Sequence, residues 1–234
     1  MGGAASVLLR KPRSYAEIYN DLDAEIVNFF VVLRDNGDEL LRRLSLTPFA
    51  RQEFIAAYGI TEDPIERARR TAIKSLMGFG SDAVRRASGF RSSSNRSGTT
   101  PSHDWATYPT ALGAVVKRLQ GVVIERRDAN TLIRAHDGPD TLHYVDPPYV
   151  HSTRTGAKRY AHEMTDADHV TLAETLLSCR GKVIVSGYPS PLYDHLFKGW
   201  RRVERSTFAD GALPRTEVLW LNFDSGPTAV PLFT

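Results

Sequence analysis

Cysteine is almost absent from this sequence, because its 234 residues include only Cys179. A single thiol excludes a disulfide framework and leaves no cysteine cluster for zinc, so we expect no metal site. Long apolar runs are also missing: no stretch approaches the ~18 residues that a membrane-spanning helix needs, and the amino terminus is not a signal peptide. These absences favour a cytoplasmic protein with no membrane partner.

The overall composition is that of an ordinary globular protein, but the charge is unevenly distributed. Hydrophobic residues make up 41%, charged residues 24%, and the formal net charge is +3. One segment holds eight basic residues against a single acid, Asp82. A basic surface of this kind suits a phosphate backbone, although a solvated helix face explains the same pattern. The eight are Arg67, Arg69, Arg70, Lys74, Arg85, Arg86, Arg91 and Arg96.

Hydrophobic periodicity predicts alternating strands and helices at both ends of the chain, with a mostly helical segment between them. This pattern is typical of a doubly wound α/β sheet with an insert. We assign 1–35 and 108–234 to the sheet domain and 36–107 to the insert. The predicted strands are 14–19, 122–125, 141–145, 182–186, 200–208 and 217–223, and the predicted helices outside the insert are 22–34, 108–119, 129–134 and 166–179.

The most informative motif is Asp146-Pro147-Pro148-Tyr149, directly after the predicted strand 141–145. Chance gives this tetrapeptide roughly once in a thousand chains of this length. An acid and a rigid turn at the carboxyl end of a strand lie where open α/β sheets bind ligands. A proline turn with an Asp cap is the structural alternative. The tetrapeptide resembles the catalytic motif of S-adenosylmethionine-dependent, Dam-like DNA adenine methyltransferases.

Methylation of adenine N6 gives each residue of this motif a role. The amine is a poor nucleophile, because its lone pair is delocalised into the ring. The Asp146 carboxylate and the Pro147 carbonyl are acceptors for its hydrogens, and both prolines stiffen the turn. Tyr149 would stack on the base, which must be flipped out of the duplex. The chemistry requires no metal, and no histidine base.

Further segments are similar to the phage-type members of this family, in the same order and over nearly the whole chain. Residues 17–22 and 124–129 resemble its cofactor motifs, and 185–188 and 215–222 resemble later segments. The resemblance implies that Asp21 and Leu22 contact the ribose of S-adenosylmethionine, and that Asp128 and Ala129 lie near its adenine. It also assigns cofactor contacts to Asp146 and to Gly2 and Gly3. Asp21 is equally suited to cap the following helix.

The insert occupies the place of the family's DNA-recognition region, so we expect double-stranded DNA as the partner and a monomeric protein. Candidate DNA contacts are Arg85, Arg86, Arg91 and Arg96.

The resemblance fails at the amino terminus, where residues 1–8 match only the end of the family's glycine turn and the helix after it. The expected fold is therefore a Rossmann-like class I methyltransferase sheet that lacks its first strand, which would leave two buried strand edges unpaired. Such a chain is expected to bind cofactor weakly or not at all. It would then represent either part of a longer enzyme or a decayed prophage gene.

Two other functions stay open at this point. A catalytically dead DNA-binding remnant of a prophage methylase would use the same basic insert, and cofactor binding separates it from an enzyme. An RNA adenine methyltransferase would share the catalytic turn, although the long insert argues against it. The DNA recognition sequence and a restriction partner are not readable from these residues.

Overall fold

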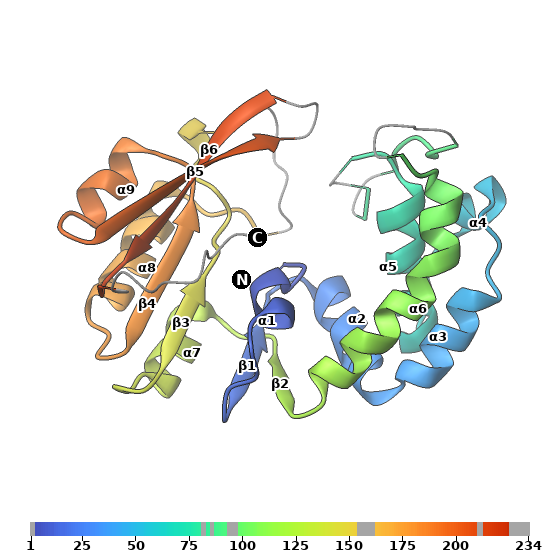
Figure 1. Ribbon diagram of the computed structural model, residues 1–234, viewed down its shortest axis with the longest axis horizontal. Helices are drawn as coiled ribbons and strands as arrows, with labels where there is room; N and C mark the ends of the chain where they lie inside the picture. Colours follow the sequence, from blue (N-terminus) through green and yellow to red (C-terminus); the bar gives the residue numbers. More distant parts are fainter. Residues whose placement is uncertain are drawn as a thin grey trace. The chain divides into compact units, whose positions relative to one another are not determined.

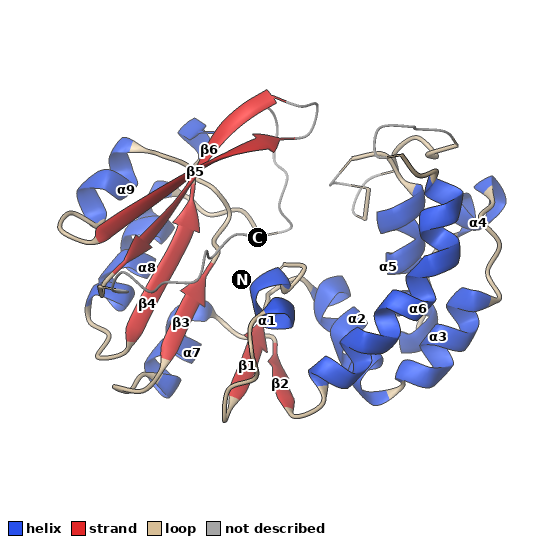
Figure 2. Ribbon diagram, in the orientation of Figure 1, coloured by secondary structure: helices blue, strands red, loops and turns tan. Residues whose placement is uncertain are grey.

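A computed structural model describes residues 3–80, 83–84, 87–92, 98–153, 162–209 and 213–224. The chain forms two compact units, which we call the amino-terminal unit (Gly3–Arg126) and the carboxyl-terminal unit (from Arg127 onward). Each has its own sheet and its own hydrophobic core. Figure 1 follows the chain through both units, and Figure 2 distinguishes their helices from their strands.

The amino-terminal unit combines a two-stranded parallel sheet with a helical bundle. β1 (Glu17–Asn20) pairs with β2 (Val122–Glu125), and Tyr19 lies opposite Ile124. The buried core joins this sheet to the long helices through residues such as Tyr19, Leu33, Ile73 and Leu119. The helices are α1 (Ser6–Arg10), α2 (Ala24–Asp35), α3 (Gly37–Ser45), α4 (Arg51–Ala56), α5 (Pro64–Met77) and α6 (Pro101–Leu119).

A buried ion pair anchors β1 to α6. The Glu17 carboxylate, 4% exposed, accepts bonds of 2.6 and 2.8 Å from the two Nη atoms of Arg118. Lys11 also pairs with it, and the Ser14 backbone N–H donates to it at 3.1 Å. These donors, above all Arg118, lower the pKa of Glu17 from its usual 4.5 to about 2. Arg118 also donates to the Leu8 carbonyl at 2.7 Å, which ties α1 to the same point.

The carboxyl-terminal unit contains a mixed four-stranded sheet in the order β3-β4-β6-β5. β3 (Leu142–Val145) is parallel to β4 (Lys182–Gly187), and Val145 lies opposite Val185. β6 (Leu213–Leu221) runs antiparallel to both β4 and β5 (Arg201–Ala209). From Val183 to Gly187 every residue of β4 is buried, as expected for a central strand covered on both faces.

Three helices pack against one face of this sheet. They are α7 (Ala129–His136), α8 (Asp166–Leu177) and α9 (Pro191–Leu196). Their apolar side chains share a core with Val183, Val185 and Trp220. A second, smaller cluster of Ile184, Leu219 and Leu221 lies on the other side. The short 3₁₀ helix η1 (His151–Thr153) follows the tetrapeptide.

This α/β architecture with parallel β3–β4 and β1–β2 pairs agrees with the expected fold class. Within the described residues, β1 has a strand partner only on its β2 side and β3 only on its β4 side. The assignment of 36–107 as a separate insert stays a prediction.

Most predicted elements are present, and most of their ends lie within three residues of the predicted ones. The largest differences concern helix starts. In the insert, Thr47-Pro48 and Asp63-Pro64 each combine a capping residue with proline and predict a helix start. At Thr47 the prediction is wrong: its hydroxyl donates back to the Arg43 carbonyl at 2.8 Å, and α4 begins only at Arg51. Asp63-Pro64 does begin α5, with the Asp63 side chain accepting from the Ile65 N–H.

Two helical segments were misjudged. The helix predicted from Tyr108 begins at Pro101, where Thr100 caps it, and Pro109 is accommodated inside it. α9 was not predicted at all, although Ser190-Pro191 is a cap followed by proline, and the Ser190 hydroxyl accepts from the Tyr193 N–H at 3.2 Å. None of the helices in the described part of the chain is long and apolar enough to cross a membrane.

We predict that Glu17→Gln destabilises the chain by about 2 to 3 kcal/mol at pH 7, because it leaves Arg118 without its buried counter-ion. The pKa of Glu17 is lower in the folded than in the unfolded chain, so its contribution is complete above pH 4.5 and is lost as the pH falls toward 2. Urea unfolding at pH 7 and pH 3 should show the deficit shrinking at the lower pH. The exposed Glu62→Gln is the control; equal losses for both variants would contradict the prediction.

Candidate active site

The tetrapeptide turn lies at the carboxyl end of β3, as the sequence predicts. Val145 is the last strand residue, and Asp146 follows it directly. Pro147 and Pro148 are buried, whereas Asp146 and Tyr149 are half-buried. The two prolines therefore anchor the turn in the protein, while the two residues with chemical functions keep access to its surface.

Ser186 holds the Asp146 carboxylate. Because β3 and β4 are parallel and Val145 lies opposite Val185, the residues that follow each of them meet at the same edge of the sheet. The Ser186 hydroxyl donates to Asp146 Oδ1 at 2.8 Å, and Ser186 is only 8% exposed. A hydrogen bond from a buried donor restricts the rotation of the carboxylate and keeps it ready to accept a further donor.

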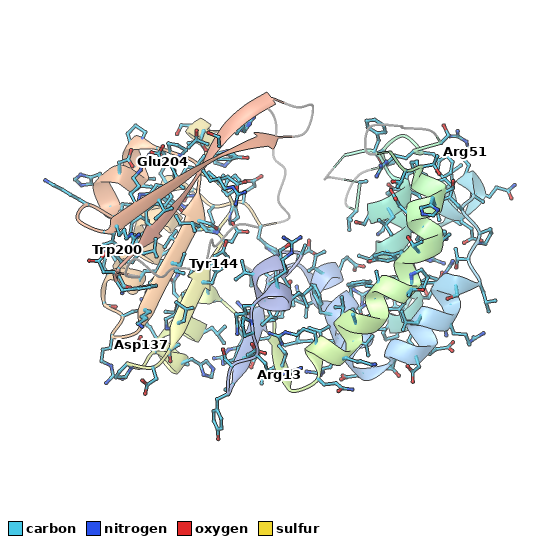
Figure 3. All side chains as sticks on the ribbon, viewed as in Figure 1. Arg13, Arg51, Asp137, Tyr144, Trp200 and Glu204 are labelled. Carbon is cyan, nitrogen blue, oxygen red and sulfur yellow. The ribbon has the colours of Figure 1, made fainter. Side chains whose placement is uncertain are left out.

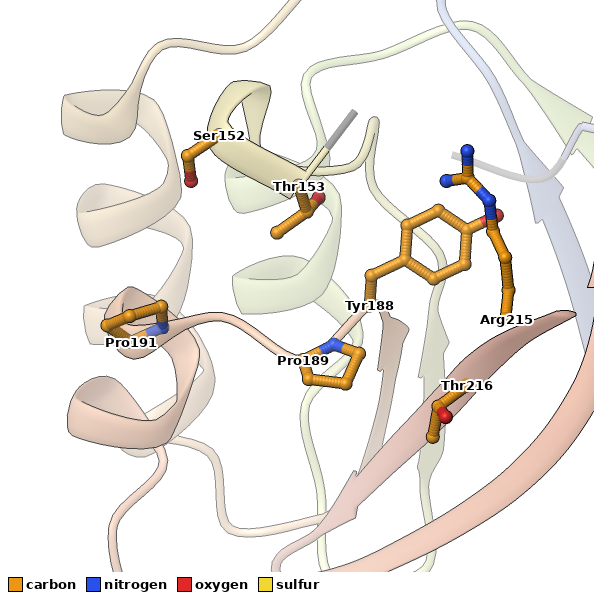
Figure 4. Close-up of a pocket in the computed structure, with 7 residues that line it drawn as sticks. All are labelled: Ser152, Thr153, Tyr188, Pro189, Pro191, Arg215 and Thr216. Carbon is orange, nitrogen blue, oxygen red and sulfur yellow. The ribbon is translucent and has the colours of Figure 1, made fainter. Parts of the chain in front are cut away.

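Tyr149 is paired with a second aromatic ring two residues beyond Ser186. The centroids of Tyr149 and Tyr188 are 4.2 Å apart, with the rings inclined by 52°. The guanidinium of Arg215, on β6, lies over the Tyr188 ring at 5.1 Å. Figure 4 shows this guanidinium beside the hydroxyl end of Tyr188. Tyrosine and arginine thus present flat surfaces and a positive charge next to the turn.

A pocket of about 520 Å³ adjoins these rings (Figure 4). Its volume is within the range of about 300–1,000 Å³ typical of small-molecule sites. The lining combines hydroxyl groups, proline rings and the Arg215 cation. It consists of Ser152, Thr153, Tyr188, Pro189, Pro191, Arg215 and Thr216.

Behind the turn, Tyr193 and His169 form a buried polar pair. The Tyr193 hydroxyl lies 2.9 Å from Nδ1 of His169, and both residues are at most 3% exposed. Burial, with the charge of Asp146 as a second cause, raises the pKa of Tyr193 well above its usual value, so it stays protonated. His169 thus has a buried side-chain partner, and the expectation that no histidine acts as a base stays a prediction.

Asp21 follows β1 in the amino-terminal unit, at the carboxyl end predicted for it. Its carboxylate accepts hydrogen bonds from the backbone N–H of Gly3 at 2.9 Å and of Asp23 at 2.8 Å. Asp23, not Asp21, caps α2, which corrects the alternative expectation for Asp21. Gly3 has a φ of +47°, in the region that favours glycine. The Leu22 carbonyl accepts from Arg126 Nε at 3.0 Å.

Asp128 caps α7 in the carboxyl-terminal unit. Its carboxylate accepts from the Thr131 backbone N–H at 2.9 Å and from the Thr131 hydroxyl at 3.0 Å. Ala129 begins the helix and is 8% exposed. Since Asp128 itself is exposed, its carboxylate can serve as a helix cap and still accept a ligand donor.

The basic segment is less positive than its composition indicates. Three of its arginines, all on α5, form ion pairs with acids outside the counted residues. Arg67 binds Glu25 at 2.6 Å, Arg69 binds Glu66 and Glu53 at 2.8 Å, and Arg70 binds Glu66 at 2.7 Å. Charge counting along the sequence missed these pairs because their partners are helical or tertiary neighbours.

Of the four predicted DNA contacts, Arg91 is described and lies beside a small aromatic cluster. Its backbone N–H donates to the Met77 carbonyl, and its neighbour Phe90 packs against Phe49 and Phe54. Arg51 caps this cluster with its guanidinium 4.9 Å from the Phe90 ring, and Figure 3 shows it near the start of α4. The remaining predicted residues, Arg85, Arg86 and Arg96, lie outside the described residues, as does Gly2 of the cofactor set.

The sequence model of the family described as D12 class N6 adenine-specific DNA methyltransferase matches residues 1–209. The chain belongs to this family. A comparison with curated proteins gives no match. The family makes the chain an enzyme of the methyltransferase class, and it makes DNA the substrate.

Two residues beside the motif were not predicted as site residues, namely Ser186 and Tyr188. Both belong to segment 185–188, which resembles the family, but their closeness to Asp146 and Tyr149 becomes clear only from the register of β3 against β4. The signal available in the sequence is their position at the end of the next buried strand. Arg51 gave no such signal, because it lies far from Arg91 along the chain.

We predict that Ser186→Ala lowers kcat for adenine methylation about tenfold with little change in KM for DNA, because the Asp146 carboxylate loses the donor that orients it. Steady-state kinetics on a DNA duplex would measure both constants. The matched control is Ser178→Ala, which removes another serine hydroxyl that donates to a carbonyl, that of Thr175. A change confined to KM, or equal effects of both substitutions, would rule out the orienting role.

Proposed function

We propose that this methyltransferase transfers a methyl group from S-adenosylmethionine to N6 of an adenine flipped out of double-stranded DNA. The observation that carries the proposal is the grouping of a carboxylate held by Ser186 with the Tyr149–Tyr188 pair, at the end of β3. This grouping contains an acceptor for an amine and a flat surface for a base, which are what N6 methylation requires.

The reaction requires the protein to increase the nucleophilicity of the adenine amine. Asp146 and the Pro147 carbonyl would accept its two hydrogens, which favours a tetrahedral nitrogen with a localised lone pair. The new N–C bond would form as the bond between the methyl carbon and the sulfonium sulfur breaks, and N6 would then release one proton to solvent. The Ser186 hydrogen bond fixes the orientation of Asp146 before the base arrives, and such preorganisation reduces the cost of reaching the transition state.

The base must leave the duplex to reach this turn, because its amine is otherwise paired and stacked. Tyr149 would stack on the flipped adenine, and Tyr188 supports Tyr149 from the next strand. Arg215 lies beside Tyr188 at the wall of the pocket, so it is suited to a phosphate of the flipped nucleotide.

The residues assigned to the cofactor have donor and acceptor groups that fit it. S-adenosylmethionine supplies a methyl group on a positively charged sulfonium. The Asp21 carboxylate is held by two backbone N–H groups and is suited to ribose hydroxyls. Asp128 is an exposed carboxylate suited to the amine of the cofactor adenine. Gly3 provides a backbone without a side chain next to Asp21.

DNA affinity is assigned to the insert and, within it, to basic residues that form no ion pair with an acid among the described residues. Arg91 and Arg51 meet this description around Phe90, whereas the α5 arginines are neutralised by glutamates. Gly78 and Phe90 form an isolated antiparallel β-bridge, and the next residue after Gly78, Phe79, is 61% exposed and adds an aromatic surface there. Cations next to exposed aromatic rings suit nucleic acid, which offers both phosphates and bases.

The decisive test is methyl transfer from labelled S-adenosylmethionine to a DNA duplex, with N6-methyladenine identified by mass spectrometry. Asp146→Asn is expected to reduce the rate at least about a thousandfold while DNA binding is retained, because the amide cannot accept with the strength of a carboxylate. Asp140→Asn, at an exposed carboxylate before β3, is the matched control and should keep full activity.

Three other outcomes have distinct meanings. Activity that survives Asp146→Asn would refute the role of the turn. DNA binding without calorimetric binding of S-adenosylmethionine would favour a non-catalytic DNA-binding protein. Preference for single-stranded RNA in a competition assay would move the proposal to an RNA substrate.

We predict that Arg91→Ala weakens DNA binding severalfold and reduces the slope of log affinity against log salt concentration by about one, because one phosphate contact is lost. Binding isotherms at four salt concentrations would measure both. Arg42→Ala is the control, since its exposed guanidinium on α3 pairs with Glu39 at 2.7 Å. An unchanged salt slope for Arg91→Ala would remove it from the DNA surface.

A further inference from the structure

The start of β3 carries a second group of reactive side chains, at the opposite end of the strand from Asp146. Asp137 follows α7, His143 is the second residue of β3, and Cys179 follows α8. Their potential metal-binding atoms all lie within 4.8 Å of one another. Figure 3 shows Asp137 at this end of the carboxyl-terminal unit, with Tyr144 further along the strand.

His143 provides an independent sign of a missing ligand. Its side chain is 9% exposed, and its Nε2 is buried without a hydrogen bond in the described part of the chain. Nε2 lies 3.5 Å from Asp137 Oδ1, but the geometry between them is not that of a hydrogen bond. Buried polar atoms in native proteins almost always have a partner, and a bound ion is one of the recognised explanations for an exception.

Two backbone N–H groups orient the Asp137 carboxylate. It accepts from the backbone N–H of Arg180 at 2.9 Å and of Gly181 at 3.0 Å. A side chain on residue 181 would approach the Thr141 carbonyl to 2.7 Å, so glycine is required for this close arrangement. Hydrogen bonds that orient a ligand in this way are a regular feature of metal sites.

We propose that Asp137, His143 and Cys179 form a zinc-binding site at the start of β3. Thiolate, imidazole and carboxylate are all zinc ligands, with bonds of about 2.0–2.3 Å, and the thiolate and the imidazole favour zinc over magnesium and calcium. Three protein ligands leave the fourth tetrahedral position for water. This site is independent of methyl transfer, and the single cysteine of the chain did not suggest it.

Charge and proton balance are consistent with such a site. The Asp137 carboxylate and the Cys179 thiolate together neutralise Zn²⁺. Cys179 Sγ donates to the Thr175 carbonyl at 3.4 Å, so its thiol proton passes to solvent when the metal binds. No electron is transferred. Arg180 Nε lies 3.7 Å from Asp137 Oδ2, but its side chain is 71% exposed and is able to move into water.

The contraction required of the three side chains is small. Bonds of about 2.0–2.3 Å in a tetrahedron place ligand atoms about 3.3–3.8 Å apart, so separations of up to 4.8 Å must shorten by about 1 Å. The bound metal would then join the segment after α7, the strand β3 and the segment before β4. It would fasten the two strands whose other ends carry Asp146 and Ser186.

Cobalt(II) is a suitable probe, because a tetrahedral cobalt thiolate gives a charge-transfer band in the near ultraviolet. The full chain has one cysteine, so any such band must come from Cys179. We expect one equivalent of Co²⁺ per chain, displaced by Zn²⁺, and a thermal midpoint that rises when Zn²⁺ is added. His143→Gln and the isosteric Asp137→Asn should each weaken binding at least about tenfold.

His195→Ala is the matched control, since it removes an exposed histidine from α9 in the same unit. Retained affinity in both His143→Gln and Asp137→Asn would overturn the site, because cysteine alone would then be holding the metal. One Co²⁺ per two chains would equally overturn it, by showing a bridge between copies. Circular dichroism of each metal-free variant separates lost binding from lost folding.

Discussion

The parallel pairing of β3 with β4 is the constraint on which the catalytic arrangement depends. Because Val145 lies opposite Val185, the next residue of each strand reaches the same sheet edge, and Ser186 meets Asp146 at 2.8 Å. The same register brings Tyr188 to Tyr149. A shift of one residue would turn Ser186 to the other face of the sheet and separate both pairs. The burial of β4 on both faces makes such a shift costly, since each side chain would move from the core in which it packs to the opposite one.

In the amino-terminal unit, the number of basic residues in a segment does not give the charge that the segment presents to a partner. The arginines of α5 form one of the most basic stretches of the sequence, yet Glu25, Glu53 and Glu66 neutralise three of them. Those pairs hold α5 to its neighbours. Arg51 and Arg91 lie instead beside the aromatic cluster of Phe49, Phe54 and Phe90. This cluster offers a nucleic acid both positive charge and aromatic surface.

The sequence predicted the parts of this protein that depend on neighbours along the chain. The end of β3 and the rigid turn after it, the cap at Asp63 and the final antiparallel strands are all local patterns. Contacts between distant segments were not accessible to this reasoning. Ser186 became a site residue only through strand register, and Pro109 inside α6 shows that packing outweighs the local preference for ending a helix at proline. The roles of Asp21, Asp128 and the insert stay predictions.

The two ends of the β3–β4 pair have different chemistry, and this difference follows from the direction of the strands. At the carboxyl end the chain leaves the sheet through prolines, with the half-buried Asp146 and Tyr149 beside them, and Tyr188 lines a pocket. At the amino end the chain enters both strands through segments held by Asp137, whose carboxylate receives the Arg180 and Gly181 N–H groups. A carboxylate that caps the entry to β4 limits how far that strand can slide against β3. A metal at Asp137, His143 and Cys179 would add a further link at this end of the pair, between the segments that enter β3 and β4.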